Sequence, residues 1–277
     1  MQNKPLNQTG LDVRLSARKG ELTGQTAGRA PDYLQGNVVI LPVKYAADFL
    51  LFCKNNPKPC PLIGVSRPGD TTIDTLAADM DIRSDIPRYR VFENGELVTE
   101  QNDIQSIWSN DMVTFVLGCS FTFEEALMSN GYRVRHIEQN SNVPMFETNI
   151  DTVPGGVFTG PLVVTMRSYP SEQIPAIFDL SANYPHAHGT PVYWGDSKRI
   201  GIDDLQSPDY GDPVVVPENE IPVFWACGVT PQAAIKSAKP QICITHAPGC
   251  MLLTDKPSSA APLVSVQLSQ FWQQHLS

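Results

Sequence analysis

A short turn between an expected strand and an expected helix carries the first candidates for chemistry. The strand covers 112–117, and Gly118, Cys119 and Ser120 stand directly before the helix. Because free N–H groups and the dipole of a helix N-terminus favour an anion, this turn could hold a substrate carboxylate. The same field would lower the pKa of Cys119, which makes its thiol a catalytic candidate. The alternative is a small buried cysteine beside a serine that only caps the helix.

Histidines supply the second group of candidates. His246 follows an expected strand, and imidazole is suited to proton transfer near neutral pH; a structural histidine with satisfied hydrogen bonds is the alternative. His186 and His188 stand two residues apart, with Asp196 downstream. These side chains could bind a metal ion together with His246. The spacing is not a tight ligand motif, so a pair of loop histidines used for hydrogen bonding is the preferred interpretation.

Arginines at strand ends supply the third group. Arg167 ends the expected strand 161–166, where its guanidinium could clamp a carboxylate through two parallel N–H donors. Arg67 follows the expected strand 62–65 in a similar way. A surface ion pair is the alternative for both residues. If Arg167 faces a wet cleft, Arg167→Lys should weaken substrate binding about ten- to a hundred-fold and leave folding nearly unchanged.

The stretch 221–253 predicts how some of these candidates are positioned. The apolar run Val223 to Cys227 ends at Gly228, Thr230 opens a short helix, and the apolar run Ile242 to Thr245 follows. Strand, helix and strand form a βαβ unit with parallel strands. Because ligands bind where parallel strands end, Gly228 and His246 should line the same edge of one sheet.

Other patterns predict the rest of the architecture. The strand 37–41, a helix after Pro42 and the strand 62–65 form a second expected βαβ unit, and Asn94-Gly95 predicts a hairpin. The fold class is therefore α/β, with a mainly parallel three-layer α/β/α domain and a smaller two-layer α+β domain. Polar connections near 100–111 and 206–213 suggest the division. The α/β domain would contain residues 1–111 and 210–277, and the α+β domain would be inserted as residues 112–209.

Composition limits the partners and the compartment. The 277 residues include 29 acidic and 20 basic side chains, and the net charge of −9 argues against nucleic acid or an anionic membrane as a partner. The chain has six cysteines without a C-x-x-C pair, a first segment without the apolar core of a secretory signal, and no apolar run of membrane-spanning length. We expect a cytoplasmic protein with free thiols, and self-association into a homo-oligomer is left open. The adjacent acidic pairs Glu124-Glu125 and Asp203-Asp204 are interpreted as solvated faces.

Several long motifs resemble the D-glutamate cyclase family. In chain order they are NPKPCPLIG, FVLGCSFTFEEAL, RHIEQNSNVPMFETNI, FTGPLVVTMRS, HGTPVYWGD, IGIDDL, PVFWACGVTPQ and ITHAPGCMLLTD. The resemblance runs from about residue 23 to residue 255. Tyr193 and Ser197 depart from the family pattern, which often has histidine and proline at these two places. Any role of that histidine is therefore in doubt in this chain.

The resemblance implies a two-domain α/β hydro-lyase that converts D-glutamate to 5-oxo-D-proline and water, or a related dehydration of a small acidic amino acid. No phosphate-binding loop is evident, and we expect no cofactor. The open alternatives are a metal-dependent hydrolase or lyase that uses His186, His188, Asp196 and His246, and a non-catalytic protein that binds a small acid. Cys119, Arg167, His188 and His246 are expected to face one cleft between the two domains. The candidate catalytic residues are His246, Cys119 and His188. The candidate substrate-binding residues are Arg167, Ser120, Gly118, Gly228, Thr230, Asp196 and Arg67.

Overall fold

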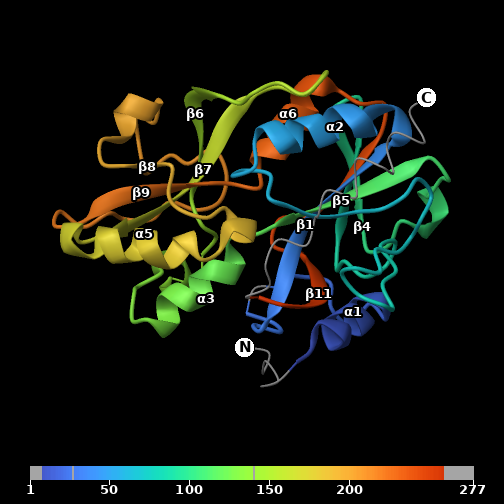
Figure 1. Ribbon diagram of the computed structural model, residues 1–277, viewed down its shortest axis with the longest axis horizontal. Helices are drawn as coiled ribbons and strands as arrows, with labels where there is room; N and C mark the ends of the chain where they lie inside the picture. The colour runs from blue at the N-terminus through green and yellow to red at the C-terminus, as the bar shows by residue number, and fades with distance from the viewer. Residues whose placement is uncertain (1–7, 27, 140, 259–277) are drawn as a thin grey trace.

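The computed structural model describes residues 8–26, 28–139 and 141–258, whose strands form two sheets (Figure 1). The larger sheet has the order β2-β5-β1-β10-β3-β4, and β11 also pairs with β1. Its strands are β1 (Tyr33–Pro42), β2 (Leu62–Val65), β3 (Tyr89–Glu93), β4 (Glu96–Gln101), β5 (Met112–Gly118), β10 (Cys243–His246) and β11 (Leu252–Pro257). The smaller sheet has the order β6-β7-β9-β8. Its strands are β6 (Met145–Asp151), β7 (Pro161–Tyr169), β8 (Tyr193–Trp194) and β9 (Ile221–Ala226).

The helices pack on both sheets. The α-helices are α1 (Gly10–Arg18), α2 (Val43–Asn55), α3 (Phe121–Ser129), α4 (Arg135–Glu138), α5 (Ile174–Ala182) and α6 (Thr230–Ala238). Short 3-10 helices are η1 (Gln105–Ile107), η2 (Ser171–Gln173), η3 (Pro185–Ala187) and η4 (Ser197–Ile200). Apolar residues of α2 and α6 pack on one face of the larger sheet, whereas those of α3 and α5 pack on the smaller sheet. The protein therefore has a mixed α/β fold with two sheets, each of which packs apolar helix residues on one face.

The expected mainly parallel sheet is wrong. Every neighbouring pair of strands in both sheets is antiparallel. The expected βαβ unit over 221–253 fails because its two strands belong to different sheets: β9 pairs with β7 and β8, and β10 pairs with β1 and β3. Helix α6 carries the chain from one sheet to the other. Gly228 and His246 therefore do not end neighbouring parallel strands.

The second expected βαβ unit is also corrected. Strands β1 and β2 are both antiparallel to β5, so they run in the same direction, but β5 lies between them. An α-helix does connect the two strands, as the apolar spacing predicts. The periodic pattern identified the helix, whereas the insertion of a later strand depends on contacts between distant parts of the chain.

Two local predictions are confirmed. Helix α6 begins at Thr230, has proline in its first turn and ends before Pro240. Asn94 and Gly95 connect β3 to β4, and both have positive φ angles of 51° and 86°, which a two-residue hairpin turn of this kind requires. In both cases residues within one turn of each other determine the backbone, so the sequence pattern was sufficient.

The strands of the two sheets alternate along the chain in an order that bears on domain organisation. Strand β5 belongs to the larger sheet, the next three strands and β9 belong to the smaller one, and the chain then returns to the larger sheet. An inserted domain over 112–209 remains a proposal, since sheet membership alone does not define an independently folding unit. The chain crosses from the larger to the smaller sheet directly after β5, and it crosses back directly after β9.

Candidate active site

The two crossing points lie against each other at two glycines and an asparagine. Gly118, the last residue of β5, donates its N–H to the carbonyl of Pro61 at 2.9 Å, and its own carbonyl accepts from Asn37 Nδ2 at 2.9 Å. A Cβ atom at Gly118 would lie 1.6 Å from the carbonyl oxygen of His186. A Cβ atom at Gly228, just after β9, would lie 2.6 Å from Asn37 Nδ2. The turn after β5, the turn after β9 and strand β1 therefore converge on one place.

Arg167 lies in β7 and reaches the start of α3. Its Nε donates to Glu124 Oε1 at 3.1 Å and its Nη2 also bonds that oxygen, while Nη1 donates to Thr165 Oγ1 at 3.0 Å. Nη2 lies 3.4 Å from Ser120 Oγ. The guanidinium carbon lies 5.1 and 5.3 Å from the ring centroids of Phe123 and Trp225. Arg167 is only 3% exposed, so the expectation that it faces a wet cleft is wrong.

Glu124 is the partner that sequence reasoning missed. The interpretation of the adjacent pair as a solvated face is wrong for Glu124, which is 2% exposed, and correct for the exposed Asp203 and Asp204. Burial alone would raise the pKa of Glu124, but the charge of Arg167 and the contact with His136 at 3.4 Å outweigh burial and lower it to about 2. The carboxylate therefore stays ionised. The signal in the sequence was the spacing that puts Glu124 one helical turn after Ser120, whereas the packing of this side of α3 against β7 is seen only in the structure.

A backbone carbonyl fixes the ring of His188. Its backbone is left-handed, with φ of 75°, a conformation that costs energy in a residue other than glycine and is frequent at functional sites. Nδ1 lies 2.7 Å from the carbonyl oxygen of Lys58. Since a carbonyl only accepts, Nδ1 carries the proton and Nε2 has the free lone pair. Burial lowers the pKa of His188 to about 4, an effect that the Lys58 bond opposes and the charge of Arg167 reinforces, so the ring is neutral at pH 7.

His246 and His186 are fixed by the backbone. The N–H of Val38 in the neighbouring strand donates to His246 Nδ1 at 3.1 Å, and burial lowers the pKa of His246 to about 4. His186 Nε2 bonds the carbonyl of Ser258 at 2.8 Å, and its Nδ1 is buried without a partner among the described residues. His186 lies beside Gly118 through its carbonyl, whereas His246 belongs to the larger sheet.

The buried histidines predict a pH dependence of stability. The pKa values of His188 and His246 are about 4 in the folded protein and about 6.5 when unfolded. Below pH 6.5 the unfolded chain therefore binds more protons, and stability falls as the pH decreases. Between pH 6.5 and pH 5 we expect a loss of about 1.5 kcal/mol for each histidine. Denaturant unfolding at the two pH values measures this loss. His188→Gln should lose about 1.5 kcal/mol less than the wild type over this range. An equal free energy of unfolding of the wild type at both pH values would contradict the assignment.

Two cysteines flank the buried arginine. Cys119 and Ser120, 8% and 6% exposed, stand at the start of α3, and Ser120 is its N-cap residue without a side-chain capping bond. Cys227 follows β9, and sequence reasoning did not single it out. Burial raises the pKa of Cys227 to about 11, although the N–H of Val229, 3.4 Å from its sulfur, and the charge of Arg167 act in the opposite direction. Cys227 is therefore a neutral thiol at pH 7.

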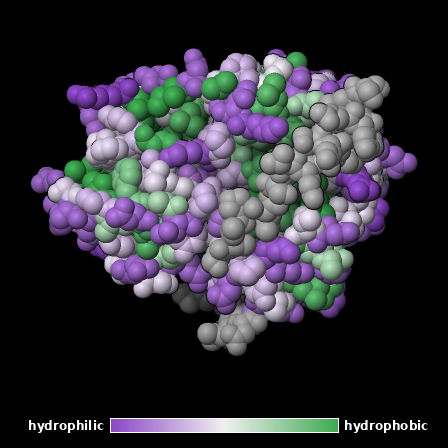
Figure 2. All heavy atoms as spheres, viewed as in Figure 1, coloured by the Kyte–Doolittle hydropathy of each residue, from purple (hydrophilic) through white to green (hydrophobic). Residues whose placement is uncertain are grey.

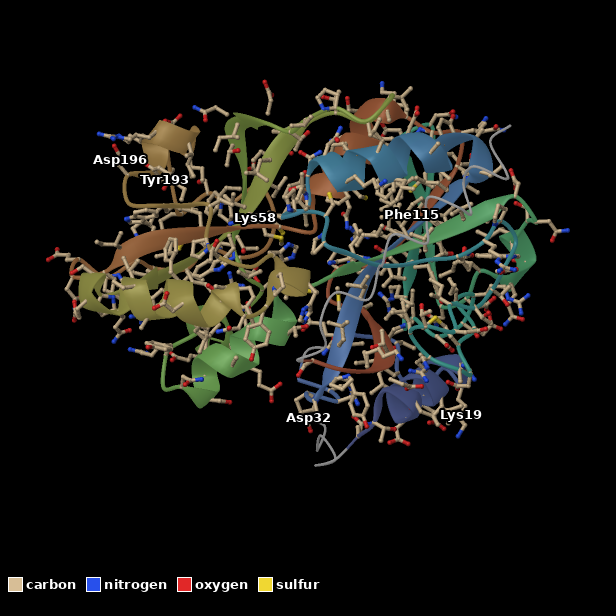
Figure 3. The ribbon with its side chains drawn as sticks, viewed as in Figure 1. Lys19, Asp32, Lys58, Phe115, Tyr193 and Asp196 are labelled. Carbon is tan, nitrogen blue, oxygen red and sulfur yellow. The ribbon has the colours of Figure 1, made fainter. Side chains whose placement is uncertain are left out.

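Three candidates occupy other places. Thr230 Oγ1 accepts the N–H of Val163 at 3.0 Å and donates to its carbonyl at 3.2 Å, so this hydroxyl joins α6 to β7. Arg67 follows β2 beside residue 112, at the opposite end of β5 from Gly118. Asp196 caps η4 and lies with Tyr193 at the far end of the smaller sheet, away from Lys58 (Figure 3). The structure therefore gathers Gly118, Cys119, Ser120, Arg167, His188 and Gly228, but not Thr230, Arg67 or Asp196.

Neither a metal-ligand cluster nor a membrane-spanning helix is found in the described part of the chain. No three side chains of His, Cys, Asp or Glu there form a group that could hold a metal ion. The set His186, His188, Asp196 and His246 is accordingly not assembled. None of the described helices has the length and apolar character needed to cross a membrane.

The profile of the D-glutamate cyclase family matches residues 113–255, which include the whole cluster around Arg167. A protein named "Putative hydro-lyase" from Bordetella petrii is 52% identical over 255 residues, 92% of this chain and 97% of the relative. The chain therefore belongs to the D-glutamate cyclase family.

Further relatives have the same name. One from Bacillus licheniformis is 53% identical over 244 residues, 88% of this chain and 93% of the relative. One from Rhizobium johnstonii is 52% identical over 251 residues, 90% and 93% of the two chains. The solved structure of a nitrogen repressor-like protein from Methanococcus jannaschii covers 90% of this chain and 99% of its own at 11% identity, with a TM-score of 0.36, a likeness too weak to bear on fold or function.

Proposed function

We propose that the protein is a hydro-lyase that acts on a small acidic amino acid, with D-glutamate as the substrate and 5-oxo-D-proline and water as the products. The observation that carries this proposal is family membership, with more than half of the residues identical to relatives named as hydro-lyases over nearly their whole length. The buried cluster after β5 supplies side chains that fit the steps of such a dehydration.

The reaction requires one group that moves protons. The α-amine must lose a proton before its nitrogen attacks the γ-carboxyl carbon, and the oxygen that leaves when the C–O bond breaks must gain protons to depart as water. His188 is the preferred group, because its Nδ1–H is fixed on Lys58 and its Nε2 is unprotonated at neutral pH. The lowered pKa makes the ring a weaker base than an ordinary histidine, and once protonated the imidazolium releases its proton readily to the departing oxygen. Cys119 and His246 remain further catalytic candidates.

The reaction also requires donors for two carboxylates. Arg167 is already paired with Glu124, so its charge is largely compensated and we assign it a supporting role beneath Ser120. The N-terminus of α3, with Cys119 and Ser120, remains the preferred place for a carboxylate. Backbone N–H groups directed at the developing negative charge would stabilise the transition state of cyclisation.

A turnover assay tests the proposal. The purified protein is incubated with D- and L-glutamate and other small amino and hydroxy acids, and mass spectrometry is used to detect loss of one water. We expect loss of water from D-glutamate. Binding of D-glutamate without turnover, measured by calorimetry, would instead favour a non-catalytic acid-binding protein. Activity that disappears on chelation and returns with a metal ion would favour the metal-dependent alternative.

His188→Gln should reduce turnover about 100- to 10,000-fold, the usual effect of removing a general acid–base group. Glutamine keeps a neutral polar side chain of similar size at this buried position, and thermal melts show whether folding is retained. His186→Gln is the matched control, because His186 is also buried and hydrogen-bonded to a backbone carbonyl. Steady-state kinetics and thermal melts are measured on both variants. Equal turnover of His188→Gln and the wild type would remove His188 from the mechanism.

A further inference from the structure

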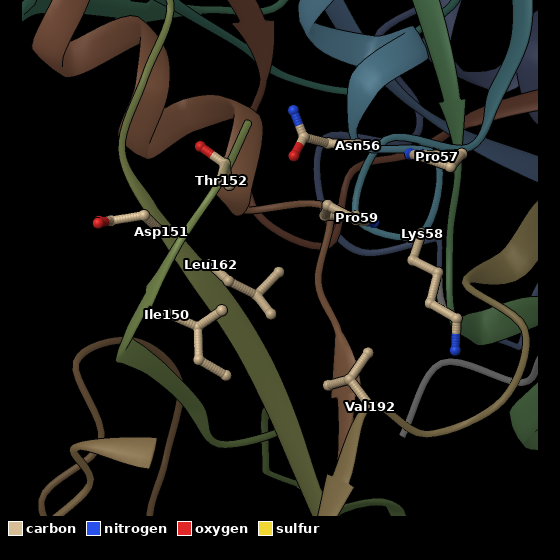
Figure 4. A pocket seen from close by; sticks show the side chains of 9 residues that line it. All are labelled: Asn56, Pro57, Lys58, Pro59, Ile150, Asp151, Thr152, Leu162 and Val192. Atoms are coloured by element: carbon tan, nitrogen blue, oxygen red, sulfur yellow. The ribbon is translucent and has the colours of Figure 1, made fainter. Parts of the chain in front are cut away.

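A surface pocket lies beside the candidate site but contains none of its catalytic residues. Its volume is about 220 Å³, and it opens between the loop 56–59 and strands β6 and β7 (Figure 4). Its apolar wall consists of Pro57, Pro59, Ile150, Leu162 and Val192. The polar lining residues are engaged elsewhere: Asn56 bonds the backbone of Val153, and Thr152 Oγ1 donates to the carbonyl of Gly160. The pocket therefore offers a complementary surface to an apolar group rather than to a small acid.

An exposed apolar ridge runs next to this pocket. Val153, Val157 and Leu51 are 56%, 49% and 47% exposed, and adjoining exposed apolar side chains of this kind mark interaction sites. The ridge is held against α2: Val153 N–H donates to Asn56 Oδ1 at 2.9 Å, and Val157 N–H donates to Asp48 Oδ2 at 3.2 Å. Figure 2 shows hydrophobic atoms gathered over β6 and the stretch that leads from it. Because their backbone N–H groups are bonded to side chains of α2 and the residue after it, Val153 and Val157 are held in exposed positions.

Two opposite charges flank the pocket. The ammonium group of Lys58 lies on Thr190, whose carbonyl and hydroxyl accept at 2.8 and 2.7 Å, and the carboxylate of Asp151 lies on the opposite side of the pocket (Figure 4). Among the described residues neither charge has an ion-pair partner. Both side chains point away from the centre of the pocket, so they form its rim. An apolar centre with a charged rim is the usual arrangement of a protein contact.

We infer that this face binds the same face of a second copy of the chain, related by a two-fold axis. A two-fold axis through the pocket brings Lys58 of each copy opposite Asp151 of the other, which satisfies both charges at once. It also places the ridge of each copy next to the pocket of the other, because a two-fold contact uses one self-complementary patch twice. A different protein would need an acidic group opposite Lys58 and a basic group opposite Asp151. A second copy supplies both groups, because the same surface is used twice.

The proposed contact reaches the candidate site through Lys58. The carbonyl oxygen of Lys58 accepts Nδ1–H of His188 at 2.7 Å, while its side chain belongs to the rim. A second copy seated on the rim would therefore restrict the loop that orients His188. The inference does not depend on the chemistry proposed above, since self-association is measured without substrate.

Sedimentation velocity over a range of protein concentrations tests the contact. We expect the wild type to form a dimer and Val153→Glu to raise the dissociation constant at least about ten-fold, the effect of losing one well-buried apolar contact. Val98→Glu is the matched control, because Val98 is an apolar residue that is 51% exposed in β4 of the other sheet. Melting temperatures of both variants show that the fold is retained. A monomeric wild type, or equal behaviour of the two variants, would overturn the inference.

Charge reversal tests the two-fold arrangement itself. Lys58→Glu and Asp151→Lys should each weaken the dimer, because each places two like charges opposite each other in the pair. The double variant Lys58→Glu/Asp151→Lys exchanges the two charges and should restore the dissociation constant to within a few-fold of the wild type. A double variant that dimerises no better than the single variants would show that the two residues do not face each other across the contact.

Discussion

Arg167→Met is expected to lower the free energy of unfolding by about 3–5 kcal/mol, the range observed when one partner of a buried ion pair is removed. The change leaves the Glu124 carboxylate almost fully buried without its main counter-charge. It also leaves Thr165 Oγ1 and Ser120 Oγ without a donor that they have in the wild type. Urea unfolding at pH 7 measures the effect. Arg199→Met is the control, because that pair is largely exposed and should contribute less than about 1 kcal/mol.

Removing both charges should cost less than removing one. In Arg167→Met/Glu124→Met two apolar side chains of suitable length replace the pair, and such replacements are often nearly neutral. A double-mutant cycle with Glu124→Met therefore separates the cost of an unpaired charge from the contribution of the pair. Strictly additive effects of the two substitutions would show that the pair is not coupled.

The same pair predicts an acid limit. Because the pKa of Glu124 is lowered from 4.5 to about 2 in the folded protein, its stabilisation is complete above pH 4.5 and is lost as the pH falls towards 2. Arg167→Met should lose much less stability in this range, because it lacks the charge that lowers the pKa of Glu124.

Gly118→Ala is expected to destabilise the protein by about 3 kcal/mol, the upper part of the range for overpacking a buried position. The added methyl group would lie 1.6 Å from the carbonyl oxygen of His186, and this oxygen belongs to the backbone and cannot rotate away. Relief would require η3 to separate from the end of β5, which would also displace His188. We therefore expect turnover to fall together with the melting temperature.

Gly24→Ala is the matched control for this substitution. A Cβ atom at Gly24 would meet no atom within 4 Å, and its backbone does not require glycine. We expect a change within about 0.5 kcal/mol, or slight stabilisation because alanine restricts the unfolded chain. Differential scanning calorimetry of the two variants makes the comparison. A Gly118→Ala variant as stable as Gly24→Ala would show that the turn after β5 can move away from His186.

The prediction of the site from sequence was partial for a specific reason. Arg167, His188 and the turn Gly118–Ser120 were identified because each was expected to follow a strand or to stand in a glycine-bearing loop, where side chains can converge. Arg167 in fact lies within β7, which continues to Tyr169. Glu124 was misassigned, because a pair of adjacent acidic residues usually lies in solvent. Cys227 was missed, because a cysteine after an apolar run usually belongs to the core. Only the packing of α3 against β7 makes the difference, since it brings Glu124 under the guanidinium of Arg167.

Several local elements and the family could be predicted from the amino-acid sequence. Apolar spacing defined α2 and α6, Asn94-Gly95 defined the hairpin, and the long motifs identified the D-glutamate cyclase family. Tertiary structure alone decided which strands pair. An apolar run shows that a strand is buried, but its partner is set by burial against residues far away in the chain, so β9 and β10 could be assigned to one parallel sheet although they belong to two antiparallel ones. The same long-range packing decided that Arg167 is buried and paired, because the burial of a charge depends on what the fold places around it.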